Sequence, residues 1–288
     1  MTGSGLICSF VSDRMPELWL RIGEHLMLTG LSTLFAILIG VPLGIFIFRY
    51  AILRSPLMGV IGILQTIPSL AMLVFLLAIL KKIGAAPALI ALTIYALLPI
   101  VRNTLTGLEG VPSNLTEAAK GIGMTAYQVL KLVRFPLAVP VIVAGIRTAA
   151  VVGVGIATLS AFIGAGGLGQ FINRGLALSD TNLILLGAIP AAILAMIVDF
   201  SIGGLEWALK PERKRDKNGS FSAIIRPIVF TMPFILILTG ILPKFTASLP
   251  FFNQASSYLN KDKTIRIGTK NYTEQIILGE IMAHRNYC

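Results

Sequence analysis

The sequence is poor in charged side chains and in the residues that carry most active-site chemistry. Only 13% of its 288 residues are charged, and it has two cysteines and two histidines. Cys8 and Cys288 lie at opposite ends, which gives neither a metal-ligand spacing nor a disulfide framework. His25 and His284 are equally isolated, and we expect His25 to be interfacial in the membrane. The sequence therefore predicts no metal site and no cofactor.

The sequence also lacks a phosphate-binding loop. No Gly-x-x-x-x-Gly-Lys-Ser/Thr pattern occurs, so the chain cannot cradle the phosphates of ATP in this way. A Gly-x-Gly-x-x-Gly pattern does occur at residues 164–169, but it follows a long apolar segment instead of a strand, which argues against a dinucleotide site. We expect no enzymatic activity in this chain, and any ATP hydrolysis that drives it must come from another polypeptide.

Apolar residues, by contrast, make up 55% of the sequence, and the mean hydropathy is +0.84. This composition is typical of an integral membrane protein and not of a soluble domain. The net charge of +11 is then explained by basic loops on the cytoplasmic face. No segment combines basic and aromatic residues as a nucleic-acid surface does. We therefore expect membrane lipid around the chain and no nucleic-acid partner.

About six apolar segments are long enough to cross a bilayer, which takes about 20 residues of helix. They lie at residues 26–48, 57–80, 86–101, 137–162, 183–207 and 228–242. The second is broken at Pro68, whose ring frees a backbone carbonyl at membrane depth. Residues 1–23 are expected to form an external or interfacial segment in which a helix starts at Pro16. Residues 249–263 are polar and have the composition of a linker.

A polar stretch between the third and fourth segments has the composition of two short helices joined by a turn. Ala118 and Ala119 favour a helix, and Gly123 breaks it. A second helix is expected over residues 125–133. Pro136 then restarts the chain where the next apolar segment begins. We therefore expect a small helical elbow that projects from one side of the membrane.

This stretch resembles the EAA loop of ABC-transporter permeases. The resemblance rests on Glu-Ala-Ala at 117–119, Gly123, and Val-Arg-Phe-Pro at 133–136, where the family pattern has Leu in place of Phe135. It implies a coupling helix that sits in a groove of a separate cytoplasmic ABC ATPase subunit. The residues implied in this role are Glu117, Ala118, Ala119, Gly123 and Pro136. The alternative is a short amphipathic helix in an unrelated membrane protein.

The core of the chain, about residues 24–210, is similar to permeases of the osmoprotectant type. The resemblance implies an all-α polytopic membrane protein with a MetI-like fold, placed in the bacterial cytoplasmic membrane. Residues 24–212 would form the permease domain, and residues 213–248 a basic loop and the final span. Two permease copies, identical or not, would pair with two ATPases and with a substrate-binding protein or domain.

The function implied by this resemblance is the import of glycine betaine, choline, carnitine or proline betaine by alternating access. Permeases of the same fold also carry other cargo, such as ergothioneine or methionine. An ion-driven secondary transporter is an alternative from another class. Such transporters often show inverted repeats and paired acidic residues in broken spans. No clear repeat is visible here.

The basic residues are distributed as expected if the elbow is cytoplasmic. The three loops on that side carry twelve Lys and Arg residues, against five in the outer segments before the sixth span. This orientation places the C-terminal tail outside. Residues 264–288 resemble the opening strand, loop and helix of an osmoprotectant-binding domain, but they are too few to hold a substrate. The candidate residues in this stub are Lys270, Asn271, Thr273 and Glu274.

Polar groups inside the apolar segments are candidates for the translocation path. They are Gln65, Thr66, Pro68, Ser69 and Tyr95. Polar packing between helices is an equally weighted explanation. The glycine-rich segment resembles a position near the external gate of osmoprotectant and methionine permeases. Its candidate gate residues are Gly164, Gly166, Gly167 and Gly169.

Two charged residues lie deep within apolar segments. Arg147 and Asp199 each lie roughly ten residues from the cytoplasmic end of their helices, and so at a similar depth. Charges at such depth are costly and are usually paired or in contact with water. Either the two side chains pair or line an inner vestibule, or each separately reaches a backbone carbonyl or the interface.

Overall fold

The computed structural model describes residues 3–209, with side-chain surroundings for residues 12–209. Every regular element within residues 3–209 is a helix. The sixth predicted span, the linker and the candidate residues of the C-terminal stub lie outside the described residues. Those stub residues are Lys270, Asn271, Thr273 and Glu274.

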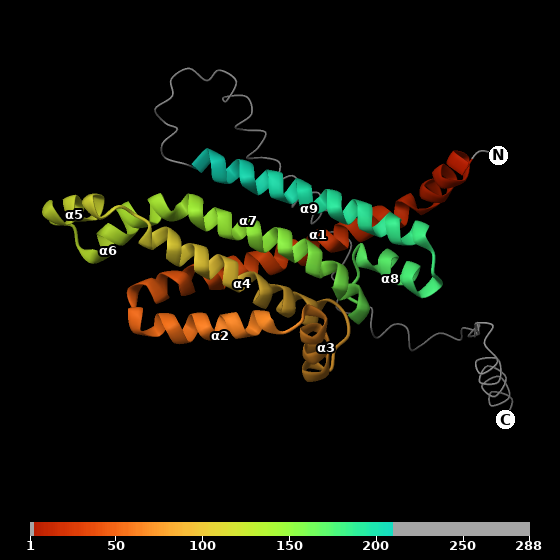
Figure 1. The fold of residues 1–288 in the computed structure, drawn as a ribbon, viewed down its shortest axis with the longest axis horizontal. Coiled ribbons are helices and arrows are strands. Elements are labelled where there is room, and N and C mark those ends of the chain that lie inside the picture. The colour runs from red at the N-terminus through yellow and green to blue at the C-terminus, as the bar shows by residue number, and fades with distance from the viewer. Residues whose placement is uncertain (1–2, 210–288) are drawn as a thin grey trace, which may run out of the picture. The chain divides into compact units, whose positions relative to one another are not determined.

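The chain forms a bundle of long helices with a small helical elbow at one end (Figure 1). In order, the elements are α1 (Gly3–Arg49), η1 (Ala51–Leu53), α2 (Arg54–Thr66), α3 (Ser69–Leu80), α4 (Ala85–Glu109), α5 (Ser113–Gly121), α6 (Ala126–Gln128), η2 (Val129–Arg134), α7 (Phe135–Leu159), η3 (Ser160–Ile163), α8 (Gly169–Leu178) and α9 (Thr181–Leu209). α5 and α6 lie at the end of the bundle opposite α8.

Four helical segments are long and apolar enough to cross a membrane. They are Ser12–Arg49, Ala85–Glu109, Ala126–Ile163 and Thr181–Leu209. The pair α2 and α3 gives a fifth if it is counted as one span bent by 97°. These five correspond in order to the five spans that the sequence predicts before residue 210. The third is longer than predicted, because α4 continues past residue 101 to Glu109.

α1 is one helix across the boundary expected at residue 23. Pro16 lies inside it, so the predicted helix start at Pro16 is wrong. A proline removes one backbone hydrogen bond and crowds the preceding turn, and tertiary packing can offset that cost. Here Leu18 is buried in a cluster with Phe171 of α8 and Leu183 of α9. The helix is therefore packed against α8 and α9 at Leu18.

α4 lies at the centre of the bundle and packs against both α1 and α7. Glycines at these crossings let the backbones come close. A Cβ atom on Gly44 would lie 2.6 Å from the Cβ of Thr104. One on Gly145 would lie 2.5 Å from the Cβ of Asn103 and 2.8 Å from the carbonyl oxygen of Pro99. Close approach at small residues is a usual means of helix association where lipid removes the hydrophobic driving force.

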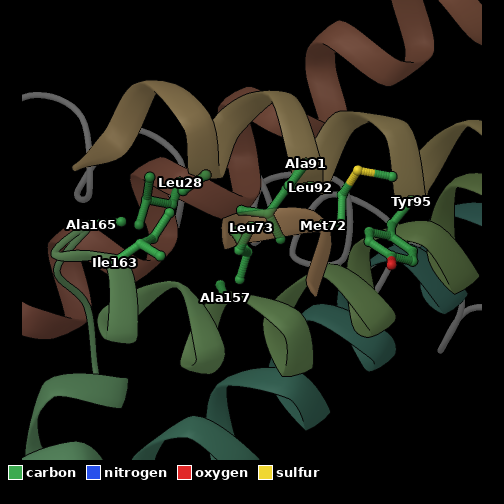
Figure 2. Packing of buried hydrophobic residues seen from close by; sticks show 10 residues of the cluster. Leu28, Met72, Leu73, Ala91, Leu92, Tyr95, Ala157, Ile163 and Ala165 are labelled. Carbon is green, nitrogen blue, oxygen red and sulfur yellow. The ribbon is translucent and has the colours of Figure 1, made fainter. Parts of the chain in front are cut away.

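The bend at Pro68 turns α3 into the bundle. Ile67 and Pro68 both have extended backbone conformations, with ψ of 127° and 135°. Met72 and Leu73 of α3 are then buried in a cluster with Tyr95 of α4 (Figure 2). The break therefore places Met72 and Leu73 in the interior of the bundle, while most of the other apolar side chains of α3 stay exposed.

Pro136 lies in the first turn of α7, as predicted, but the expected break before that helix is absent. α6, η2 and α7 form one continuous helical segment, Ala126–Ile163. In a regular α-helix the ring of Pro136 would collide with the carbonyl of Leu132. Leu132 lies in η2, a wider π-helical turn, which can absorb such a conflict.

Substitution of Gly145 by alanine is expected to destabilise the bundle. The new Cβ would press on the backbone of α4, and overpacking costs about 1–3 kcal/mol. The better helix propensity of alanine returns about 1 kcal/mol of this. Thermal unfolding of the detergent-solubilised protein should therefore show a lower midpoint for Gly145→Ala than for the wild type.

Gly153→Ala is the matched control, because it lies on the same helix and has no neighbouring atom within 4 Å of a new Cβ. Its midpoint should equal or exceed that of the wild type. If Gly145→Ala is as stable as Gly153→Ala, the close crossing of α4 and α7 at this point is wrong.

Candidate functional site

The loop between α7 and α8 turns at glycines that have a positive φ. They are Gly164, Gly166 and Gly167, with φ of 73°, 88° and 80°. This left-handed region is strained for other residues. The loop is also tightly seated, because a Cβ on Gly166 would lie 2.6 Å from a carboxylate oxygen of Glu24. One on Gly169 would lie 1.8 Å from the carbonyl oxygen of Thr158. All four predicted gate glycines therefore lie in or directly after this turn.

Two side chains of α1 hold this loop by its backbone. The N–H of Gly167 donates to Glu24 Oε2 at 2.9 Å, and the N–H of Leu168 donates to His25 Nδ1 at 3.4 Å. The other ring nitrogen of His25 lies 3.0 Å from the carbonyl oxygen of Val154 in α7. His25 is completely buried, whereas the sequence suggested an interfacial residue. Sequence reasoning gave neither side chain a role at this loop.

An ion-pair chain continues from this point along α1 to α8. Arg21 contacts Glu24 at 2.9 Å and Glu17 at 3.5 Å. Glu17 in turn contacts Arg174 of α8 at 2.9 Å. The charges alternate in sign along the chain, so each carboxylate has a cation beside it.

The predicted path residues of the second and third spans lie together at the break in the second span. The amide of Gln65 donates to the carbonyl oxygen of Tyr95 at 2.6 Å, and the Tyr95 hydroxyl donates to the carbonyl of Ile67. Thr66 bonds within its own helix, to the carbonyl of Ile63. Thr66 and Pro68 are exposed, while Ser69 is half-buried at the start of α3. Gln65 and Tyr95 therefore hold the break, which favours the packing explanation for these two residues.

Arg147 of α7 and Asp199 of α9 form a bidentate ion pair. Its two N–O distances are both 2.6 Å. Glu206, which the sequence analysis did not select, lies 3.5 Å from the same guanidinium. A Cβ on Gly203 would lie 3.0 Å from its central carbon, so the guanidinium lies close against α9 between the two carboxylates. Of the two arrangements expected from the sequence, the structure forms the pair.

The elbow is built from α5, a turn and α6. Gly123, with φ of 88°, makes the turn. Thr125 then caps α6 in a reciprocal box with Gln128, whose backbone N–H lies 3.3 Å from the Thr125 hydroxyl. Among the predicted coupling residues, Glu117, Ala118, Gly123 and Pro136 are exposed, whereas Ala119 is buried. The EAA residues therefore do not share one surface.

The predicted residues fall into four separate groups: the glycine loop, the break at Pro68, the Arg147 pair and the elbow. The loop and the elbow lie at opposite ends of the bundle. Within residues 3–209 no group of three or more His, Cys, Asp or Glu side chains could hold a metal ion. The four groups are joined by the long helices instead of meeting in one pocket.

Comparison with known families decides the class of protein. Residues 36–240 match the family described as the inner membrane component of binding-protein-dependent transport systems. The chain belongs to this family. It is therefore a multi-pass membrane protein and a component of a transport system, as the elbow and the apolar segments predicted.

Two curated permeases are similar to this family member over nearly their whole length. The carnitine transport permease protein OpuCB of Listeria monocytogenes is 44% identical over 73% of this chain and 96% of its own length. The glycine betaine/carnitine/choline transport system permease protein OpuCB of Bacillus subtilis (strain 168) is 43% identical over 71% of this chain and 94% of its own. Both are permease components of transporters and not enzymes.

The fold is also similar to that of a solved permease. An inward-facing structure of the MetNI methionine ABC transporter has a chain that is 25% identical, with a TM-score of 0.62, over 68% of this chain and 98% of the solved chain. The predicted fold class, an all-α permease of MetI-like architecture, is confirmed.

Neutralising either member of the Arg147–Asp199 pair is expected to destabilise the permease, and the two changes should not be additive. Arg147→Gln leaves two carboxylates of α9 without their shared cation, whereas Asp199→Asn leaves Arg147 with Glu206. The first single variant should therefore lower the unfolding midpoint more than the second. Side chains in one ion-pair network couple by about 0.5–3 kcal/mol, so the double variant should lose less than the two singles together.

The measurement is a double-mutant cycle on the solubilised permease. Arg102→Gln serves as the control for loss of a cation, because Arg102 is exposed and forms no ion pair within residues 12–209. Strict additivity of the two singles would show that the pair contributes nothing to the bundle.

Proposed function

We propose that the chain is the membrane-spanning permease subunit of an ATP-driven bacterial importer for osmoprotectants. The observation that carries the proposal is the 44% identity to a carnitine permease over 96% of that protein's length. A glycine betaine, carnitine and choline permease and a choline permease of Bacillus subtilis (strain 168) are 43% and 42% identical. We expect cargo of the same chemistry here: small quaternary ammonium compounds such as glycine betaine, choline, carnitine or proline betaine.

The elbow is proposed as the docking point of a separate cytoplasmic ATPase. α5 ends the bundle on one side. Its Leu115 and Ala118 share one helical face with Ile122, the residue that caps the helix, by their spacing of three and four residues. Leu115 and Ile122 are 43% and 76% exposed, which is unusual for apolar side chains beside a polar turn. An apolar groove on a partner would cover them. Buried Ala119 then positions α5 on the bundle and does not contact the ATPase.

We propose that two permease copies, identical or homologous, pair with two ATPases, since each chain presents one elbow. The elbow and the basic loops would face the cytoplasm, and the glycine loop and the C-terminal tail would lie outside. A substrate-binding protein or domain would deliver cargo to the outer side. Closure of the ATPase pair on ATP would move the two elbows and turn the passage outward.

Methionine is the alternative cargo, because the MetNI permease shares the fold at 25% identity. The ion-driven class has lost its support, since the chain belongs to the binding-protein-dependent family. We assign no cargo-binding pocket among residues 12–209 for either cargo. The two are separated by transport measurements on the complete importer.

The proposal is tested by reconstituting the permease with its ATPase and binding protein in vesicles. Uptake of labelled choline or glycine betaine should require ATP and should be blocked by excess unlabelled osmoprotectant. Uptake that persists without nucleotide would overturn the ATP-driven mechanism. Uptake of methionine with no response to choline, carnitine or betaines would overturn the cargo assignment alone.

Placing a charge on the apolar face of α5 is expected to release the ATPase. Ile122→Asp puts a carboxylate where an apolar contact would form, and burying an unpaired charge costs several kcal/mol. Recovery of ATPase with the tagged permease from detergent should fall by more than about tenfold, since 1.4 kcal/mol already corresponds to a factor of ten. Ile122→Leu, which keeps the apolar surface, should recover the wild-type amount.

The same pull-down should be repeated with Glu117→Lys, which reverses a charge on the flank of α5. Both variants must keep the wild-type unfolding midpoint, which is expected because both side chains are exposed. Equal ATPase recovery with Ile122→Asp, Glu117→Lys and wild type would remove α5 as the docking helix.

A further inference from the structure

His25 joins three segments that are far apart in the sequence. It lies in α1, and its ring is in hydrogen-bond reach of Val154 in α7 and of Leu168 at the start of α8. The ring is 0% exposed, so these two backbone groups replace the water that the imidazole would otherwise bind. A buried histidine with both nitrogens engaged on different helices fixes their relative positions.

The two partners of His25 settle which ring nitrogen carries the proton. The carbonyl of Val154 can only accept, so Nε2 must be the protonated donor. The N–H of Leu168 can only donate, so Nδ1 must be the bare acceptor. The imidazole is therefore held neutral in a single tautomer. Each nitrogen makes a different hydrogen bond, and each bond can be removed by its own substitution.

Glu24 makes the second contact with the same loop. Successive N–H groups of a turn with left-handed residues form a concave site that favours an anion. One carboxylate oxygen of Glu24 accepts from the N–H of Gly167 and also contacts Arg21 at 2.9 Å. A side chain on Gly166 would occupy the place of this oxygen. The glycine at this position is therefore required by the carboxylate as well as by the backbone angle.

The loop also contacts the segment between α3 and α4. The N–H of Gly84 donates to the carbonyl of Ile163 at 3.0 Å, just before the loop begins. A side chain on Gly164 would lie 3.1 Å from Ile83 of the same segment. The loop is thus the point at which α1, the α3–α4 connection, α7 and α8 meet. Movement of the loop must therefore also displace parts of these four segments.

We propose that Glu24 and His25 are the positioning residues of the loop at residues 164–169, and that they tie its movement to α1 during the transport cycle. The inference rests on the proposed function, in which the chain is an ATP-driven permease with this loop on its outer side, and on the resemblance of the loop to a position near the external gate. The two side chains would not touch cargo. They would ensure that the loop opens only when α1 moves. ATP hydrolysis would then stay coupled to the opening of the gate.

Three substitutions of His25 separate the two bonds. Asn places an amide oxygen near the position of Nδ1, so His25→Asn keeps the bond to Leu168 and loses that to Val154. Gln places an amide nitrogen near the position of Nε2, so His25→Gln keeps the bond to Val154 and loses that to Leu168. His25→Phe fills the same space and loses both. Ser32→Ala is the control, because Ser32 is buried on the same helix but its hydroxyl donates within α1, to the carbonyl of Thr29.

Amide hydrogen exchange of the purified permease measures directly how well the loop's backbone N–H groups are protected. Exchange at Leu168 should be roughly tenfold faster in His25→Gln and His25→Phe, as expected for loss of a buried hydrogen bond, and unchanged in His25→Asn and Ser32→Ala. Glu24→Leu should accelerate exchange at Gly167 in the same way. Glu24→Gln retains an acceptor oxygen and should protect Gly167 more than Glu24→Leu does. Glu17→Gln removes a neighbouring charge without touching the loop and should leave Gly167 unchanged.

Transport by the reconstituted importer tests whether loss of these hydrogen bonds affects the transport cycle. Cargo transported per ATP hydrolysed should fall by roughly tenfold in His25→Phe and Glu24→Leu and stay at the wild-type value in Ser32→Ala and Glu17→Gln. Counted over permease-dependent ATP hydrolysis alone, this ratio does not depend on how much permease survives, so a variant that merely folds poorly does not lower it. Partial loss in His25→Asn and His25→Gln would show that the two bonds share the role.

Faster exchange with an unchanged transport-to-ATP ratio would overturn the positioning role and leave the hydrogen bonds as packing. Unchanged exchange in His25→Phe would overturn the contact itself. If the wild-type importer takes up cargo without nucleotide, the proposed function fails instead, and the exchange data still report whether the loop is held by α1.

Discussion

Every backbone N–H and C=O inside a bilayer needs a partner within the protein, because hydrocarbon offers none. Among the described residues, the chain interrupts its helices at Pro68 and, at one end of the bundle, at the glycine loop, and a helix elsewhere in the sequence supplies hydrogen-bond partners at each. The Tyr95 hydroxyl of α4 meets the carbonyl of Ile67. Glu24 and His25 of α1 meet the N–H groups of the loop. These side chains stabilise the irregular backbone because they form hydrogen bonds to its N–H and C=O groups.

The helices of the bundle therefore contact one another in two different ways. Where regular helices cross, glycines such as Gly44 and Gly145 let the backbones come close together. Where the helix is broken, polar side chains reach across to the exposed backbone. The first kind depends on shape and tolerates no added Cβ. The second depends on hydrogen bonds from side chains to the backbone, and at the glycine loop it also leaves no room for a Cβ on Gly166 or Gly169.

The sequence is sufficient for the features that depend on neighbouring residues. Apolar length located the spans, Pro68 located the bend and Gly123 located the turn of the elbow. The two failures have different causes, one in packing between distant parts of the chain and one in a local departure from α-helix geometry. Pro16 was expected to begin a helix, but Leu18 beside it is buried against α8 and α9. Pro136 was expected to restart the chain, but a π-helical turn accommodates it.

The sites were also predicted unevenly. Arg147 and Asp199 were selected because a charge in an apolar segment is visible locally, and their equal depth could be counted along each helix. Glu206 was missed since it lies near the polar end of α9, where a charge is unremarkable in sequence. Glu24 and His25 contact residues more than a hundred positions away. An adjacent acidic and imidazole pair at the start of an apolar run was the one local signal.

The continuity of the fourth span bears on how the two ends of the molecule communicate. The segment Ala126–Ile163 has 38 residues, and so extends roughly 57 Å at 1.5 Å per residue. It begins in α6, after the Gly123 turn that follows α5, and ends at the glycine loop, so one helical segment runs from the elbow to the proposed gate. Had Pro136 broken it, movement of α5 could have been lost in a hinge. The π-helical turn keeps the rod intact, and Arg147 fastens it to α9 partway along.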